Sequence, residues 1–186
     1  MPINIIQGNK MEFCIQASNP KTQDIVNSDD ESLSDAIESA FLLNTENAIL
    51  TWKYISIPLS YKYDISYMMD DLLKLLYSLQ NMEKGEMKIH WLPDTFRCDW
   101  SITWNHGRME IESHWECIAG HLEKLLINYP QLSVSVKYFV SEWKEILNIV
   151  LKGLKRCGYC ENRIKGMWQL AAQFNSIENS GILYQK

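Results

Sequence analysis

The sequence predicts a single α+β domain in which an antiparallel meander sheet packs against several helices. Its 186 residues are the usual size of one domain. With 46% hydrophobic and 22% charged residues, the chain has the composition of a protein that buries its own core. Segments that alternate between apolar and polar residues are interspersed with segments of helical period, which is typical of mixed strands and helices. We therefore treat residues 1–186 as one domain, with a loose tail over residues 176–186.

The most regular pattern is a Trp-rich hairpin over residues 97–105 and 108–116. A two-residue turn between these segments sets a register in which Trp104 faces Met109. All the large apolar side chains then share one face of the hairpin, and the charged side chains share the other. A slip of one residue would mix the two faces, so the sequence specifies this register. A strand over residues 87–92 completes the meander.

The other elements are predicted from apolar period, turn residues and helix-capping patterns. They are a hairpin over 3–6 and 11–16, a loop over 17–30, a helix from Ser28 or Asp29, a strand over 48–59, a helix from Asp64 to about Gly85, a short helix over 119–128, a long helix from Ser135 to Arg156 that stops at Gly158, a helix over 161–175 and a short strand over 182–184.

The sequence also indicates where the chain resides. The first residues lack the basic and apolar regions of a signal peptide, and no apolar run approaches the length of a membrane span. Five cysteines, an odd number, fit reduced thiols better than a disulfide framework. We therefore expect a cytoplasmic protein with no membrane association.

The formal net charge of −5 is concentrated in the first quarter of the chain. Residues 1–46 hold eight acidic and two basic residues, whereas the remainder is close to neutral. This imbalance disfavours nucleic acid as a ligand and favours a basic protein partner. A helix start would also favour acids in its first turn, so part of the pattern has a structural explanation. The candidate partner-binding residues are Asp29, Asp30, Glu31, Asp35 and Glu38, with Glu110 and Glu112 on the polar face of the hairpin.

Aromatic residues offer a further candidate contact. Most of the seven tryptophans fall on predicted core faces. Among Trp52, Tyr54 and Trp91, an exposed side chain would be a candidate interface anchor.

A search for catalytic chemistry finds one weak constellation. Phosphate-loop, dinucleotide-binding and metalloprotease motifs are missing from the sequence. Asp99 and His114 face each other across the hairpin and Ser101 lies diagonal to His114, which resembles a Ser–His–Asp set. Ser101, however, lies mid-strand without a nucleophile elbow, and a cross-strand ion pair between Asp99 and His114 is the simpler explanation. We expect no enzyme and no cofactor, and a small hydrolase remains one alternative.

A second alternative is a zinc-stabilised binding module. Cys157 and Cys160 form a CxxC pair, and Cys117 and His121 could complete four ligands. The pair closes a predicted helix, whereas a redox motif opens one. We therefore expect ordinary thiols and no metal.

Several segments resemble a known group of proteins. They are a strand that ends in IPLS, a helix YMMDDLLKLLYSL, the Trp-rich meander and a closing helix YFVSEWKEILNIVLKGLKRCGY. Together they resemble small bacterial cytoplasmic immunity proteins of contact-dependent and polymorphic toxin systems. This resemblance implies that the chain binds and neutralises one cognate toxin domain. Many such toxins are nucleases with basic surfaces, to which an acidic inhibitor would be complementary.

Overall fold

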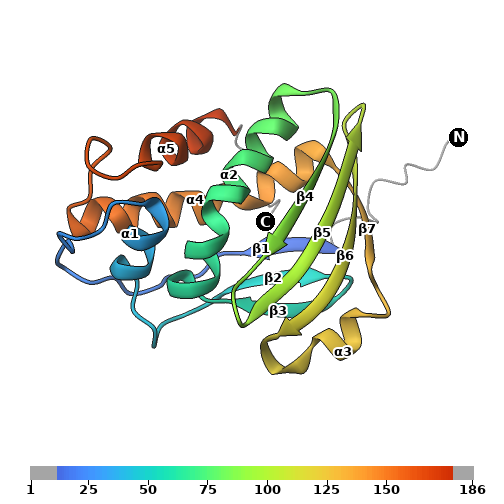
Figure 1. Cartoon of the computed structure of the whole chain (residues 1–186), viewed down its shortest axis with the longest axis horizontal. Helices are drawn as coiled ribbons and strands as arrows, with labels where there is room; N and C mark the ends of the chain where they lie inside the picture. Colours follow the sequence, from blue (N-terminus) through green and yellow to red (C-terminus); the bar gives the residue numbers. More distant parts are fainter. Residues whose placement is uncertain (1–11, 178–186) are drawn as a thin grey trace, which may run out of the picture.

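Five α-helices and two antiparallel sheets make up the computed structural model, which describes residues 12–177 (Figure 1). In chain order the elements are β1 Phe13–Gln16, α1 Leu33–Ala40, β2 Ala48–Trp52, β3 Ile55–Leu59, the π-helical turn η2 Tyr61–Ile65, α2 Ser66–Asn81, β4 Lys84–Trp91, β5 Phe96–Asn105, β6 Arg108–Ile118, the 3-10 turn η3 Ala119–His121, α3 Glu123–Leu126, β7 Gln131–Ser135, α4 Val136–Cys157 and α5 Met167–Ser176. One sheet has the order β1-β2-β3 and the other the order β4-β5-β6-β7. The predicted α+β class is confirmed, with a small second sheet beside the meander.

The β5–β6 hairpin has the predicted register. Trp104 is paired with Met109, and Asp99 is paired with His114. The apolar face of this hairpin packs on the other sheet, because the Trp52 ring of β2 lies 5.5 Å from that of Trp100. The helices α1, α2, α4 and α5 lie on this same side of the four-stranded sheet (Figure 1). The opposite face of the four-stranded sheet carries the polar residues.

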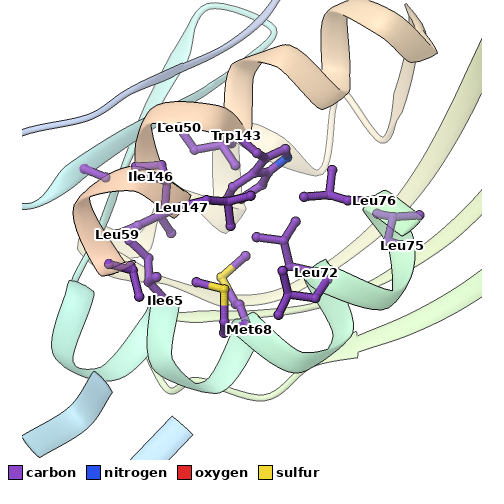
Figure 2. Close-up of a cluster of buried hydrophobic side chains, with 14 of the residues drawn as sticks. Leu50, Leu59, Ile65, Met68, Leu72, Leu75, Leu76, Trp143, Ile146 and Leu147 are labelled. Carbon is purple, nitrogen blue, oxygen red and sulfur yellow. The ribbon is translucent and has the colours of Figure 1, made fainter. Parts of the chain in front are cut away.

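The helical part of the core forms where α2 and α4 cross. Figure 2 shows Trp143 and Leu147 of α4 facing Met68 and Leu72 of α2, with Leu50 of β2 beside them. All five side chains are buried, as the helical period of both segments predicts. Burial of each such side chain stabilises the fold by about 1.5–3 kcal/mol before the entropy cost of ordering it.

The prediction of one strand over residues 48–59 is wrong, because the structure has two antiparallel strands there, β2 and β3, joined by a turn. Lys53 and Tyr54 both adopt positive φ, 48° and 70°, and reverse the chain between β2 and β3. Such turns usually contain glycine or asparagine. The absence of both residue types hid the turn from sequence analysis.

The predicted starts of two helices are also wrong. Ser32, rather than Ser28 or Asp29, caps α1, and its hydroxyl oxygen accepts a hydrogen bond from the Asp35 backbone N–H at 3.1 Å. Ser60, rather than Asp64, caps the η2 turn that precedes α2, and the Asp64 carboxylate accepts from the Ser60 backbone N–H at 2.7 Å. In both turns the capping serine is hydrogen-bonded to an acid three or four residues later, and the sequence offered competing serines and acids for each cap.

The predicted end of the second helix near Gly85 is wrong because α2 ends at Asn81 and Gly85 belongs to β4. The Trp104 ring lies over Gly85, where a Cβ atom would be 2.3 Å from the nearest ring carbon. Glycine is therefore used here for a close approach and not as a helix stop.

The remaining differences concern short segments. Residues 119–128 form only η3 and α3, because Gly120 and His121 both have positive φ. The strand β7 was not predicted, and α5 begins at Met167, later than the predicted 161. The long helix and its Gly158 stop are confirmed. The strands predicted over 3–6 and 182–184, and most of the tail, lie outside the described residues. The strand predicted over 11–16 corresponds to β1, which pairs with β2.

Candidate functional site

Helix α1 and the loop before it present part of the predicted acidic surface. Asp29, Glu31 and Asp35 are exposed, and Glu38 is half-buried. Asp35 also accepts a hydrogen bond from the Ser32 hydroxyl at 2.6 Å, so it stabilises the helix start as well as carrying surface charge. These four residues are placed where a partner can reach them.

Asp30 is the exception among the predicted acids, because it is 7% exposed. Its carboxylate accepts hydrogen bonds from the Tyr159 hydroxyl, from Asn27 Nδ2 at 2.9 Å and from Ser39 Oγ at 3.1 Å. Burial raises the pKa of the Tyr159 hydroxyl, which keeps it protonated as the donor. Asp30 therefore joins the loop before α1 to the segment after α4 and is not available to a partner.

Helix α2 extends the acidic surface with residues that sequence analysis missed. Lys62 Nζ donates to the Glu38 carbonyl at 2.7 Å and lies 5.5 Å from the centre of the Tyr63 ring, so the start of α2 adjoins α1. From Tyr63, helical spacing leads along the exposed side of α2. The residues there are Tyr63, Tyr67, Asp70, Asp71, Lys74 and Tyr77. The signal in the sequence was a row of tyrosines and acids opposite the apolar stripe.

The start of α5 borders the other end of α1. The Lys165 backbone N–H donates to the Glu31 carbonyl at 3.1 Å, and Gly166 lies against Leu33. Trp168, in the first turn of α5, is 58% exposed. We call the surface formed by these three helices the acidic helix face. It comprises Asp29, Glu31, Asp35, Glu38, Asp70 and Asp71, with the exposed aromatic residues Tyr63, Tyr67, Tyr77 and Trp168.

Three of the bases close to the acidic helix face have partners within the fold. Lys74 forms an ion pair with Asp71 at 2.8 Å, and Lys62 is bonded to the Glu38 carbonyl. Arg163 donates to the Asn27 carbonyl at the α5 end of the face. Six acids compare with four bases on or beside the face, which are Lys62, Lys74, Arg163 and Lys165, so the surface keeps a net negative charge suited to a basic partner.

Glu110 and Glu112 lie elsewhere. Both are exposed on the outer face of β6, opposite Thr103 and Ser101 of β5. Figure 1 shows β6 and α1 at opposite sides of the molecule. The predicted binding residues therefore form two separate groups.

The Ser–His–Asp arrangement is not assembled. The Asp99 carboxylate bonds to His90 Nδ1 on β4 at 2.7 Å, so the expected ion pair with His114 is wrong although the register is right. Within residues 12–177 no hydrogen bond joins Ser101 to His114, and a triad needs that link. The three side chains line one open depression of about 340 Å³ on the sheet.

The CxxC pair lies at and just after the end of α4. Cys157 is buried at the end of α4 and its Sγ donates to the Gln23 carbonyl at 2.9 Å, while Cys160 is exposed. Burial raises the pKa of Cys157, which disfavours a reactive thiolate. In the described part of the chain, no group of three or more His, Cys, Asp or Glu side chains is arranged to hold a metal ion. Neither Cys117 nor His121 therefore completes a site with the CxxC pair.

Comparison of the chain with protein-family models, with curated proteins and with solved structures found no match. No helix between residues 12 and 177 has the length and apolar character that crossing a membrane requires.

Proposed function

We propose that this chain is a cytoplasmic immunity protein that binds a basic toxin domain through the acidic helix face and thereby neutralises it. The observation that carries the proposal is the combination of concentrated negative charge with exposed aromatic side chains on three adjoining helices. Tyrosine and tryptophan supply most of the energy at many protein interfaces, and long-range charge speeds the encounter of the partners. The resemblance of the core pattern to immunity proteins supports the same function.

The arrangement of the face assigns different roles to its residues. The exposed acids, such as Glu31 and Asp70, act before contact by attracting a basic surface. Tyr67 and Trp168 act after contact, because their rings bury a large apolar area at a small entropy cost. A toxin that binds nucleic acid carries a basic surface of the required kind, so a nuclease is the toxin class we propose.

The test uses the product of the neighbouring gene as the candidate toxin. Co-expression of this chain should restore growth of cells that express the toxin domain, and the two purified proteins should form a stable complex. The double variant Asp29→Lys/Glu31→Lys should slow association by about tenfold or more at low salt, because both side chains are exposed. At about 1 M salt the difference should largely disappear.

The matched control reverses two acids on the outer sheet face. Glu86→Lys/Glu110→Lys makes the same change in net charge at exposed positions of β4 and β6, outside the acidic helix face. Its association rate should stay close to that of the wild type. If both double variants slow association equally, net charge alone explains the slower association, and the proposal that the acidic helix face is the binding surface is wrong.

A further inference from the structure

Strand β4 forms one edge of the four-stranded sheet, because among the described residues it pairs with β5 and with no other strand (Figure 1). It has eight residues, from Lys84 to Trp91, whereas β7 at the opposite edge has five. An edge strand presents a row of backbone N–H and C=O groups to which another strand can bond. β4 is therefore the longer of the two edges of this sheet.

The hydrogen-bonding pattern of the sheet determines which residues of β4 point outward. The two-residue turn makes Asn105 and Arg108 a hydrogen-bonded pair, so the odd-numbered residues of β5 from Asp99 onward bond to β6. The even-numbered residues of β5 consequently bond to β4, where their partners have odd numbers, as in the pair of Ile102 and Met87. The outward backbone groups of β4 therefore belong to its even-numbered residues, which are Lys84, Glu86, Lys88 and His90.

These outward groups are available for pairing. Within residues 12–177, no hydrogen bond from outside the sheet reaches the backbone of the four residues. The core layer also leaves the first half of β4 partly uncovered, because Met87 points to the core side but is only half-buried, whereas its β5 partner Ile102 is 1% exposed. A strand placed beside β4 would bond to the outward groups and would cover Met87.

The side chains of the same residues carry alternating charge on the outer face of the sheet. Lys84, Glu86, Lys88 and His90 are all exposed. His90 Nδ1 is bonded to the Asp99 carboxylate at 2.7 Å, so a negative charge lies beside the last of them. The order of charges along the edge is therefore complementary to itself when the strand is reversed.

Two copies of β4 that are related by a two-fold axis pair antiparallel, and each contact is made twice. For their backbone groups to bond, outward residues must lie opposite outward residues. One such register has the axis beside Met87. Glu86 then lies opposite Lys88 of the second copy, and Lys84 lies opposite His90 and near its carboxylate partner. Opposite charges across two strands stabilise their pairing.

The neighbouring registers are unfavourable. An axis beside Glu86 places this residue opposite its own copy and Lys84 opposite Lys88. An axis beside Lys88 places that lysine opposite its own copy. Like charges directly opposite one another destabilise a strand pair. The charge pattern of β4 therefore selects the register centred on Met87.

We propose that β4 is a self-association surface, which pairs with β4 of a second copy of the chain about a two-fold axis beside Met87. The two four-stranded sheets then form one continuous sheet. On the core side, the half-buried Met87 side chains of the two copies meet at the axis and cover each other. β4 contributes no residue to the acidic helix face, so this inference goes beyond the proposed function and does not depend on it.

Sedimentation equilibrium of the full chain tests the proposal. We expect a monomer–dimer equilibrium with a dissociation constant of about 10–500 µM, because two paired edge strands bury less area than a standard interface. Glu86→Lys and Lys88→Glu should each weaken the dimer by about tenfold or more, since each places like charges opposite one another twice. Glu110→Lys, at an exposed position of the inner strand β6, is the matched control and should dimerise like the wild type. All three side chains are exposed, so the unfolding temperatures should change little.

Mixing the two single variants gives a sharper test. When a Glu86→Lys chain pairs with a Lys88→Glu chain, each lysine lies opposite a glutamate, so the mixture should form a heterodimer of about wild-type affinity. The double variant Glu86→Lys/Lys88→Glu should regain the homodimer for the same reason. Its net charge equals that of the wild type, so net charge cannot explain a difference between the double variant and the single variants.

Amide hydrogen exchange locates the interface. As the protein concentration rises through the dissociation constant, exchange should slow at Glu86 and Lys88, whose N–H groups point outward. Met87 and Ile89 bond to β5 and should be protected at every concentration. This alternation from one residue to the next is specific to strand pairing at β4.

Three results would overturn the proposal. The first is a monomer at all concentrations up to about 1 mM. The second is a dimer that Glu86→Lys and Lys88→Glu weaken no more than Glu110→Lys does. The third is a failure of both the mixture and the double variant to recover the dimer. At about nanomolar concentrations the wild type is monomeric, so toxin association can be measured there independently of this equilibrium.

Discussion

Gly153 in the middle of α4 provides a sharp test of the packing between α4 and α1. A Cβ atom at this position would be 2.5 Å from the end of the Phe41 ring. Carbon atoms pack best at about 3.5–4.0 Å, so in Gly153→Ala the ring must move by about 1 Å or more. Phe41 is buried and stacked on Tyr61, with 5.3 Å between the ring centres, which limits that movement.

Two effects of opposite sign determine the result. Alanine is favoured over glycine in a helix by about 1 kcal/mol. Overpacking of a filled core costs about 1–3 kcal/mol, and the short contact with Phe41 places this case at the upper end. We therefore expect Gly153→Ala to lower the free energy of unfolding by about 1–2 kcal/mol, or the unfolding temperature by roughly 2–8 °C.

Urea unfolding, followed by tryptophan fluorescence, measures this change. Lys152→Ala, at an exposed neighbouring position of α4, is the control and should stay within about 0.5 kcal/mol of the wild type. Adding Phe41→Leu to Gly153→Ala should cost less than the sum of the single changes, with a coupling of about 1 kcal/mol. If Gly153→Ala stabilises the protein, space exists beside the helix and the packing argument is refuted.

Three further predictions concern the caps, the buried carboxyl group and the thiols. Ser32→Ala should destabilise the protein by about 1 kcal/mol in urea unfolding, and Ser28→Ala by much less. A larger effect of Ser28→Ala would show that Ser28, and not Ser32, caps α1. Burial raises the pKa of Asp64, so ionisation of this carboxyl group is unfavourable in the folded state. The stability of the wild type relative to Asp64→Asn should therefore fall as the pH rises from about 4 to 7. A rise in relative stability over this range would contradict the prediction. A thiol reagent should label Cys117 and Cys160 rapidly in the native protein and the two buried thiols only on unfolding, as mass spectrometry of labelled peptides would show.

Much of the candidate binding surface has a local origin and was predictable. The acids Glu31, Asp35 and Glu38 are close in sequence, and their excess over bases is visible in the composition. The burial of Asp30 was not predictable, because its partner Tyr159 is 129 residues away. A carboxylate that binds hydroxyl groups inside the fold and one that faces water look the same in a sequence.

The aromatic part of the acidic helix face depended on tertiary structure. Tyr67 and Trp168 belong to helices about 100 residues apart, and only the contacts of α1 with α2 and with the segment before α5 bring these helices together. The depression on β6 has the same origin, since β7 and α3 meet the strand from outside the predicted hairpin.

Local sequence is enough to predict the register of the β5–β6 hairpin and the buried face of α4. In both, the period of apolar residues matches the period of one local structure, and any shift would expose the core. The hairpin turn at Lys53 and the role of Gly85 could be found only in the folded structure. These depend on contacts between distant segments, in which a side chain such as that of Trp104 takes space that no local pattern records. Local periodicity therefore specifies which face of an element is buried, and packing between elements specifies what that face meets.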